Sequence, residues 1–357
     1  MECSKNGFFW SCGVLFVVPR RCFFVVSAYG SALERHSSVM RFFANLSYKK
    51  LCSISFEILK VITKGLVLPI VFSNFAELFV FTEYYYKPYM GLKFISFGSG
   101  SSGNCYFLYT DSDGLMIDCG IGIRAMKKYF ADYGLSLSQV RNVLITHDHA
   151  DHVKSVGSLS GEYQVPVWTT ADIHKGIYRN WCVGKKIAVA LQKQVEKEVP
   201  LQIGDFKVTP FAVPHDSVDC VGYEIEHQGI VFTIVTDCGS VTEDIRRRIN
   251  RANYLVIEAN YDTEMLLHGN YPAHLKVRIQ GDHGHLANDA CGMALVENAS
   301  EGLRHVWLCH LSEENNHPEL ARKTVESILR SSGIVAGVDF QMDVLKRKTP
   351  TGVFELV

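Results

Sequence analysis

The first 89 residues of this 357-residue chain contain no aspartate, only one of the 14 histidines and only four of the 28 glycines. Chemistry that depends on His and Asp side chains must therefore lie after residue 89. Residues 1–89 carry 10 Lys and Arg against 5 Glu, a net charge of +5, whereas residues 90–357 carry 26 Lys and Arg against 32 Asp and Glu, a net of −6. The total of −1 excludes a general electrostatic attraction to nucleic acid or to anionic membranes.

Residues 1–89 also lack an unbroken apolar run of the about 20 residues that a membrane-spanning helix needs. Their apolar stretches, 8–18, 22–26 and 65–82, are separated or interrupted by polar, charged or proline residues. We expect this segment to be a non-native upstream extension of the reading frame, with Met90 as the true start. A membrane anchor, which would bring membrane contact, and an accessory domain are the alternatives.

In residues 90–357, strand-like runs alternate with single helices and are separated by turn residues, which is typical of one folded domain. Predicted strands cover residues 92–97, 105–109, 115–117, 142–145, 165–169, 206–211, 221–227, 230–235, 254–258, 305–309, 340–345 and 352–356. Predicted helices cover residues 121–133, 171–181, 241–251, 286–299 and 318–331. This order predicts an α/β (α+β) fold in which two mixed sheets pack together with helices outside them.

The strongest chemical signal is the segment 146–152, Thr-His-Asp-His-Ala-Asp-His, directly after an apolar strand. Neutral imidazole and carboxylate groups are ligands for Zn²⁺ and related divalent ions. His147 and His149 are two residues apart, so in an extended segment they point to the same side. Asp151 and His152 come after the bend, where they can face a second ion.

Three further polar residues stand where an apolar strand ends, namely His215, Asp237 and His310. Loops at strand ends are where sites are commonly built on rigid scaffolds. Each of these residues taken alone can be an ordinary loop residue. Together, and in order behind the segment 146–152, they indicate a second set of metal ligands.

In kind and order, these residues resemble the metal-binding motifs of the metallo-β-lactamase superfamily, and the resemblance covers residues 92–357. It implies a four-layer αββα sandwich with two divalent metal ions at one edge of the sheets, Zn²⁺ first and Mn²⁺ or Fe²⁺ as alternatives. It also implies a ligand assignment: His147, His149 and His215 for the first metal, Asp151, His152 and His310 for the second, and Asp237 as the bridge.

A narrower resemblance comes from the stretches 97–104 (FGSGSSGN), 284–288 (GHLAN) and 310–316 (HLSEENN). They are similar to the bacterial YycJ (WalJ) proteins, relatives of ribonuclease Z, ribonuclease J and a cyclic phosphodiesterase. Ala287 departs from the serine expected after His-Leu. This resemblance implies a phosphodiesterase or nuclease, exonuclease-like on DNA. The inserted nucleic-acid-binding domain of the ribonuclease J group is absent from the sequence, which weakens the case for a long RNA substrate.

The expected nucleophile is a hydroxide that bridges the two ions, because paired metals lower the pKa of a shared water. Asp148, which is not expected to be a ligand, would orient or deprotonate it. His285 is the best candidate to protonate the leaving oxygen, since it matches the phosphate-contacting histidine of the phosphodiesterase relatives. His283, two residues away, is its rival.

Other site residues rest on weaker signals. Asp118 resembles the buried aspartate that orients a metal-ligand histidine in the superfamily. Ser101 and Asn104 lie in a Gly/Ser-rich loop whose backbone N–H groups could meet an anion. Lys276 and Arg278 could meet a phosphate, although such a pair is commonly surface charge.

The remaining features favour a cytoplasmic enzyme without an organic cofactor. The seven cysteines after residue 89 show no Cys-x-x-Cys spacing and are expected to be reduced thiols. The basic groups at 246–251 and 346–348 could follow a nucleic-acid backbone, but are more typical of solvated surfaces. A hydrolase of a cyclic phosphodiester, lactone or thioester is the alternative function, and a non-catalytic regulatory protein is a third.

Overall fold

The computed structural model describes residues 15–18, 21–24 and 91–357. Chain contacts divide the protein into two units, Met1–Lys87 and Pro88–Val357. In the first unit the described residues form one antiparallel pair, β1 (Leu15–Val18) with β2 (Arg21–Phe24). The expectations for the status of residues 1–89 otherwise lie outside the described residues. Among those that are described, no helix combines the length and the apolar character needed to cross a membrane.

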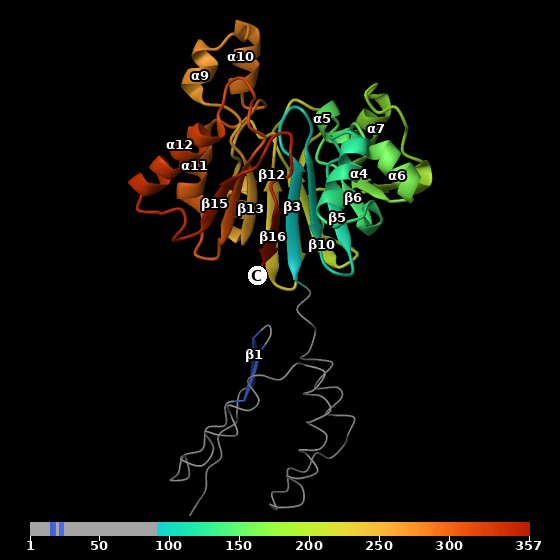
Figure 1. The fold of residues 1–357 in the computed structure, drawn as a ribbon. Coiled ribbons are helices and arrows are strands. Elements are labelled where there is room, and N and C mark those ends of the chain that lie inside the picture. The colour runs from blue at the N-terminus through green and yellow to red at the C-terminus, as the bar shows by residue number, and fades with distance from the viewer. Residues whose placement is uncertain (1–14, 19–20, 25–90) are drawn as a thin grey trace, which may run out of the picture. The chain divides into compact units, whose positions relative to one another are not determined.

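Two sheets of seven strands each form the second unit (Figure 1). The first sheet has the spatial order β16 (Val353–Leu356), β3 (Leu92–Gly98), β4 (Cys105–Tyr109), β5 (Gly114–Ile117), β6 (Asn142–Leu144), β7 (Val167–Thr169) and β8 (Gln192–Gln194). Its strands pair antiparallel from β16 to β5 and parallel from β5 to β8. The sheet is therefore mixed, as the sequence predicts.

The second sheet repeats this plan. Its order is β15 (Gln341–Val344), β14 (His305–Cys309), β13 (Tyr254–Glu258), β12 (Ile230–Val235), β11 (Val221–His227), β10 (Phe206–Ala212) and β9 (Leu201–Ile203). Strands β15 to β12 are parallel and strands β12 to β9 antiparallel. The last two strands of the chain thus join different sheets, β15 beside β14 and β16 beside β3.

Helices cover the outer faces of both sheets (Figure 1). On the first sheet lie α4 (Ile123–Asp132), α5 (Ala150–Val153), α6 (Val156–Tyr163) and α7 (Ala171–Arg179). On the second lie α8 (Glu243–Arg251), α11 (Asn288–Asn298) and α12 (Pro318–Ser331), while α9 (Thr263–His268) and α10 (Ala273–Gln280) form a projection at one edge. Two short 3₁₀ turns, Leu137–Gln139 and Val189–Leu191, complete the elements.

The main core lies between the sheets and is aromatic at its centre. Phe94 of β3 packs against Phe232 of β12 and Trp307 of β14, with ring centroids 5.0 and 4.7 Å apart, and all three side chains are fully buried. A second apolar cluster, which includes Ile245 and Leu329, joins the second sheet to its helices. The arrangement is helix, sheet, sheet, helix, which confirms the predicted four-layer αββα sandwich.

Local sequence signals set several boundaries. Gln228 and Gly229 both have positive φ, 48° and 85°, so they form the tight turn predicted between β11 and β12. Gly134, at φ 69°, ends α4 as predicted, and Leu135 N–H donates to Phe130 O across it. In the second unit, six short helices and strands were not predicted: α5, α6, α9, α10, β8 and β9. All six have three to eight residues, which is too short for a clear hydrophobic period.

Candidate metal centre

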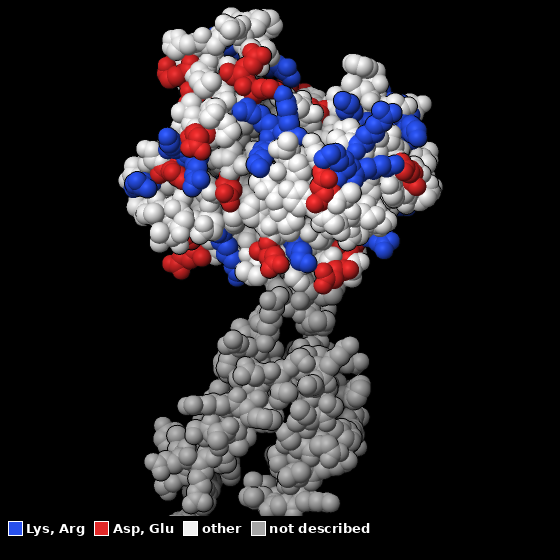
Figure 2. All heavy atoms as spheres, in the orientation of Figure 1, with Lys and Arg blue, Asp and Glu red and all other residues white. Residues whose placement is uncertain are grey.

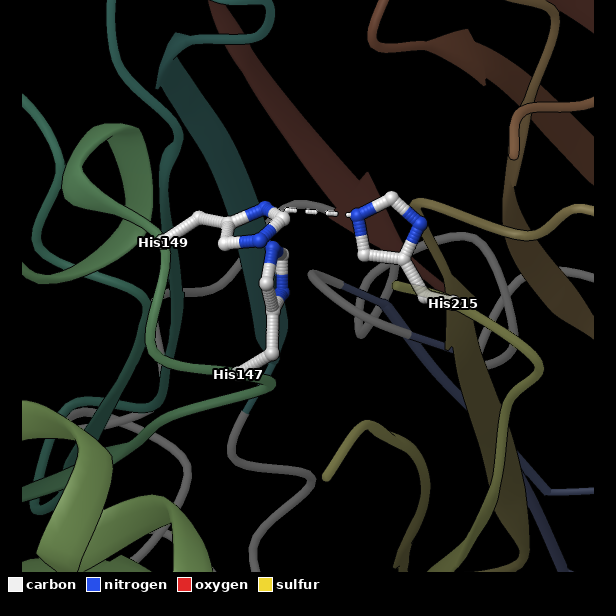
Figure 3. A group of neighbouring side chains, drawn as sticks. All are labelled: His147, His149 and His215. Atoms are coloured by element: carbon white, nitrogen blue, oxygen red, sulfur yellow. Dashed lines mark hydrogen bonds between the residues drawn. The ribbon is translucent and has the colours of Figure 1, made fainter. Parts of the chain in front are cut away.

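Three histidines converge at the edge of the sandwich where the strands of both sheets end (Figure 3). His147 and His149 follow β6, and His149 directly precedes α5. His215 comes from the second sheet, in the loop after β10. One nitrogen from each ring lies within 4.8 Å of the others, and His149 Nδ1 is 3.3 Å from His215 Nε2. Gly284 O accepts from His215 Nδ1, which turns Nε2 toward the group.

A second group lies beside the first and consists of Asp151, His152 and His310. Asp151 Oδ2 lies 3.5 Å from His152 Nε2 and 3.5 Å from His310 Nε2. His152 belongs to α5, which lies on the side of the first sheet, whereas His310 directly follows β14 of the second sheet. Both histidines are buried, so this group again joins the two sheets.

Asp237 stands between the two groups and is almost completely buried. Its Oδ2 lies 3.2 Å from His152 Nε2, and its Oδ1 lies 3.2 Å from His310 Nδ1 and 3.7 Å from His215 Nε2. Thr236 Oγ1 donates to Oδ2 and steadies the carboxylate. The structure therefore brings together all seven residues that the sequence indicates as ligands.

The donor atoms of this cluster fit divalent metal ions. His147 Nε2 and His310 Nε2 are buried and, within the described part of the chain, have no hydrogen-bond partner. Burial and the neighbouring His152 hold the pKa of His147 well below its usual range, so its imidazole is neutral, as a metal ligand must be. Burial alone would lower the pKa of His310, but the carboxylates of Asp237, Asp151 and Glu258 together outweigh it and raise the pKa to about 10. The carboxylates of this buried cluster stabilise a positive charge on His310, so the cluster is suited to bind a cation.

Three site residues have left-handed backbone conformations, which are uncommon outside glycine. Asp118 follows β5 at φ 59°, Asp237 lies two residues after β12 at φ 53°, and His310 follows β14 at φ 53°. Each conformation turns the chain sharply at a strand end. Such strain at three neighbouring positions is typical of a functional site.

Asp118 is fully buried behind the second group. Its Oδ2 accepts hydrogen bonds from His152 Nδ1 at 2.8 Å and from Thr146 Oγ1 at 2.9 Å, and its Oδ1 accepts from Thr146 N. The contact fixes the His152 ring so that Nε2 faces the cluster. Asp118 thus has the geometry of the orienting aspartate that the resemblance implies.

Glu258, the last residue of β13, is a buried carboxylate that the sequence analysis missed. Its Oε1 accepts from His310 Nδ1 at 2.8 Å and from His285 Nδ1 at 2.9 Å. Its Oε2 accepts from the backbone of Cys238 and Leu286. Burial would raise the pKa of Glu258, but the two histidines outweigh it and lower it. Its position in the sequence was the signal that could have found it. Glu258 is an acidic residue at the end of an apolar strand, as several of the predicted ligands are polar residues at strand ends.

A cavity of about 170 Å³ opens beside the cluster. His285, Arg278 and Ser101 are among its lining residues, and Tyr271 of the loop before α10 and Leu275 of α10 also contribute. Arg278 forms an ion pair with Asp216, another lining residue. Of the two candidate acids, His285 lines this cavity, whereas His283 is exposed to solvent.

The structure corrects the prediction that Asn104 contacts a substrate. Asn104 is fully buried, and its amide contacts Asp151 and lies 2.8 Å from His152 Nε2, so it supports the metal loop and does not face a substrate. The backbone N–H groups of Gly100, Gly103 and Asn104 are likewise bonded within the protein.

Two further predicted residues, Lys276 and Asp148, are not among those that line the cavity. Lys276 donates to Leu267 O within the α9–α10 projection, while Arg278, two residues on, faces the cavity. Residues two apart on a helix point to different sides. Asp148 Oδ1 accepts a hydrogen bond from Ser217 Oγ at 2.6 Å, and its Oδ2 rests against Gly176 of α7.

Residues 114–310 match the sequence family described as the Beta-lactamase superfamily domain. The chain belongs to the metallo-β-lactamase superfamily. Over 267 residues it is 32% identical to the exodeoxyribonuclease YycJ of Bacillus anthracis, covering 74% of this chain and 99% of YycJ. Over 268 residues it is 31% identical to the exodeoxyribonuclease WalJ of Streptococcus pneumoniae, covering 75% of this chain and 99% of WalJ. These matches confirm the predicted YycJ/WalJ likeness, and this superfamily member is a hydrolase.

The fold of this superfamily member is confirmed by solved structures. The metallo-β-lactamase fold protein YhfI from Bacillus subtilis superposes with a TM-score of 0.56 at 18% sequence identity, covering 74% of this chain and all of YhfI. PqqB from Methylobacterium extorquens superposes with a TM-score of 0.55 at 16% identity, covering 73% of this chain and 99% of PqqB. The 73–74% of this chain that these structures cover is close in length to the second unit, Pro88–Val357.

The substitution Asp118→Asn should weaken metal binding by about 10- to 100-fold, because it removes the carboxylate that orients His152. Metal affinity is measured by competition with a chromophoric chelator. Asp132→Asn, which alters an exposed carboxylate on α4 that pairs with Lys128, is the matched control and should bind like the wild type. Equal affinities for Asp118→Asn and the control would show that Asp118 does not orient a ligand.

Proposed function

We propose that this hydrolase is a phosphodiesterase that uses two divalent metal ions to remove nucleotides from an end of DNA. The observation that carries the proposal is the meeting of two ligand groups at Asp237, beside a cavity lined by His285. The similarity to YycJ and WalJ, both named exodeoxyribonucleases, supports DNA as the substrate class. A hydrolase of small molecules would use the same metal cluster. Only the substrate distinguishes that function from the one proposed here.

The roles of the ligand residues follow from the two groups. His147, His149 and His215 would hold one ion, and Asp151, His152 and His310 the other, with Asp237 shared. Zn²⁺ is the first choice for such His-rich sets, with Mn²⁺ or Fe²⁺ as alternatives. When bound, two such ions lower the pKa of a water and neutralise charge on the phosphodiester oxygens.

His285 is the proposed proton donor to the leaving oxygen. Glu258 Oε1 accepts from His285 Nδ1 at 2.9 Å, so Nε2 is the ring nitrogen left to carry a proton to a substrate. The side chain is 20% exposed and lines the cavity, whereas its partner Glu258 is fully buried. The carboxylate therefore fixes the ring and leaves one nitrogen accessible.

Asp148 is the proposed group that orients the attacking water. Its carboxylate is itself held by Ser217 Oγ and by the close approach of Gly176, where an added Cβ would lie 2.2 Å from Asp148 Oδ2. Arg278 and Ser101 are the proposed contacts for a substrate phosphate, because both line the cavity.

A hydrolase of a cyclic phosphodiester, lactone or thioester is the competing candidate. The observation that favours it is the small size of the cavity, about 170 Å³, since ligand pockets for drug-sized molecules are commonly about 300–1,000 Å³. We further propose a cytoplasmic location, because the seven cysteines of residues 91–357 are free thiols.

The full chain loaded with Zn²⁺ or Mn²⁺ should hydrolyse labelled DNA and bis-p-nitrophenyl phosphate, and should lose both activities when a chelator removes the metal. The two metal-ligand groups predict this dependence. Product lengths on a denaturing gel and release of p-nitrophenolate are the measurements, with a lactone and a thioester as competing substrates. Turnover of the lactone or thioester alone would overturn the proposal.

The substitution His285→Gln should lower kcat for DNA by about 10²- to 10⁴-fold, the usual contribution of a general acid. The loss should be much smaller for bis-p-nitrophenyl phosphate, because p-nitrophenolate leaves without protonation. His283→Gln, an exposed histidine two residues away, is the matched control. Equal losses of kcat on both substrates, or an unchanged kcat on DNA, would remove His285 from the role of acid.

A further inference from the structure

The C-terminal end of α7 and the loop after it present aromatic side chains to solvent. Trp181 is 88% exposed and Tyr178 is 66% exposed. Three cations are interleaved with them and are also exposed, namely Arg179, Lys185 and Lys186. Lys186 Nζ lies 5.8 Å from the centre of the Tyr178 ring. We call these five residues the α7 platform.

The charge around the α7 platform is opposite to that of the rest of the domain. Residues 170–194 contain five Lys and Arg against one Asp, a net of +4, within a domain whose net charge is −6. The one carboxylate, Asp172, pairs with Lys175 at 2.8 Å. Figure 2 shows Lys and Arg side chains gathered over the side of the domain that carries α4, α6 and α7. This surface therefore attracts a polyanion locally although the whole chain does not.

The basic group at 246–251 is neutralised within the protein. Arg248 Nη1 pairs with Glu224 at 3.0 Å, and Arg251 Nε pairs with the same carboxylate at 3.2 Å. Arg246 pairs with Glu297. These contacts join α8 to β11 and to α11, so this group does not form a free basic surface.

The α7 platform is attached to the loop that carries the metal ligands. Asn180 Nδ2 donates to Asp148 O at 2.7 Å. Gly176 packs against the Asp148 side chain, and Gly157 packs so closely on Lys185 O that an added Cβ would lie 1.6 Å from it. In Figure 1, α7 and α5 lie at the edge where the strands leading to the metal cluster end. A polymer held on the platform would therefore lie next to that cluster.

We propose that the α7 platform binds the unpaired strand of a DNA substrate, with a base stacked on Trp181 and phosphates paired with Arg179, Lys185 and Lys186. The proposal rests on the phosphodiesterase function proposed above and deepens it by naming single-stranded DNA as the bound form. Alternating aromatic and cationic side chains are the usual means of binding single strands without reading their sequence. The cavity lies on the α10 side of the cluster and the platform on the α7 side, so one strand would contact both.

The test compares the affinity of variants of the full, metal-loaded chain for labelled phosphorothioate oligothymidylate, which resists hydrolysis, by fluorescence anisotropy. Trp181→Ala should raise Kd by about 5- to 150-fold, as expected for the loss of one stacked base. Trp181→Phe keeps an aromatic face and should retain most of the affinity. The double variant Lys323→Ala, Arg330→Ala removes two exposed cations from α12 and should bind like the wild type.

The salt dependence gives a second, independent measurement. The double variant Lys185→Ala, Lys186→Ala should reduce the slope of log K against log salt by about 1.4, since each contact with a single-strand phosphate contributes about 0.7. Wild-type affinity and slope in both platform variants would overturn the proposal, and so would a wild type that does not bind the oligonucleotide. Failure of the phosphodiesterase function is distinguished by a metal-loaded wild type that binds DNA without cleaving it.

Discussion

Asp237 is the carboxylate on which the rest of the site depends. It lies at the edge where the two sheets meet, and its oxygens face histidines contributed by both. Imidazole rings close together in a buried space would repel one another if they were protonated. If they were neutral, their ring nitrogens would lose the hydrogen bonds that water gives them in the unfolded chain. A central carboxylate stabilises the protonated rings, and divalent ions, if bound, would occupy the ring nitrogens that have no other partner. Asp237 therefore contacts histidines from both sheets at this edge, beyond the aromatic core that packs the sheets together.

Polar contacts across the sheets fix the position of that carboxylate. Ser99 Oγ, in the loop after β3, accepts from His310 N at 2.9 Å, which ties the first sheet to the end of β14. Asn104 N donates to Asp151 O at 2.7 Å and holds the metal loop against the same region. Glu258 then links His310 to His285, so that a metal ligand and the proposed acid share one buried partner. The metal groups and the cavity therefore form one connected unit.

The sequence predicted what is local or periodic. The seven proposed ligands stood out because the segment 146–152 is dense in His and Asp, because His215, Asp237 and His310 each follow an apolar strand, and because their order resembles the superfamily motifs. The two-sheet order followed from the run of strands and helices. Glu258 was missed because its importance depends on which rings reach it in the fold. Asn104 and Lys276 were predicted to meet substrate, but burial and helix phase, which only the fold determines, turn them away from it. The α7 platform was missed for a similar reason, since the exposure of Trp181 cannot be read from composition.

The most direct test of the account is the metal content of the purified full chain, measured by elemental analysis beside Asp237→Ala. The account predicts two divalent ions per wild-type chain and the loss of both at the same metal concentration in the variant, because Asp237 faces both ligand groups. A wild type that binds a single ion, or an Asp237→Ala protein that retains two, would contradict the shared carboxylate on which the proposed chemistry depends.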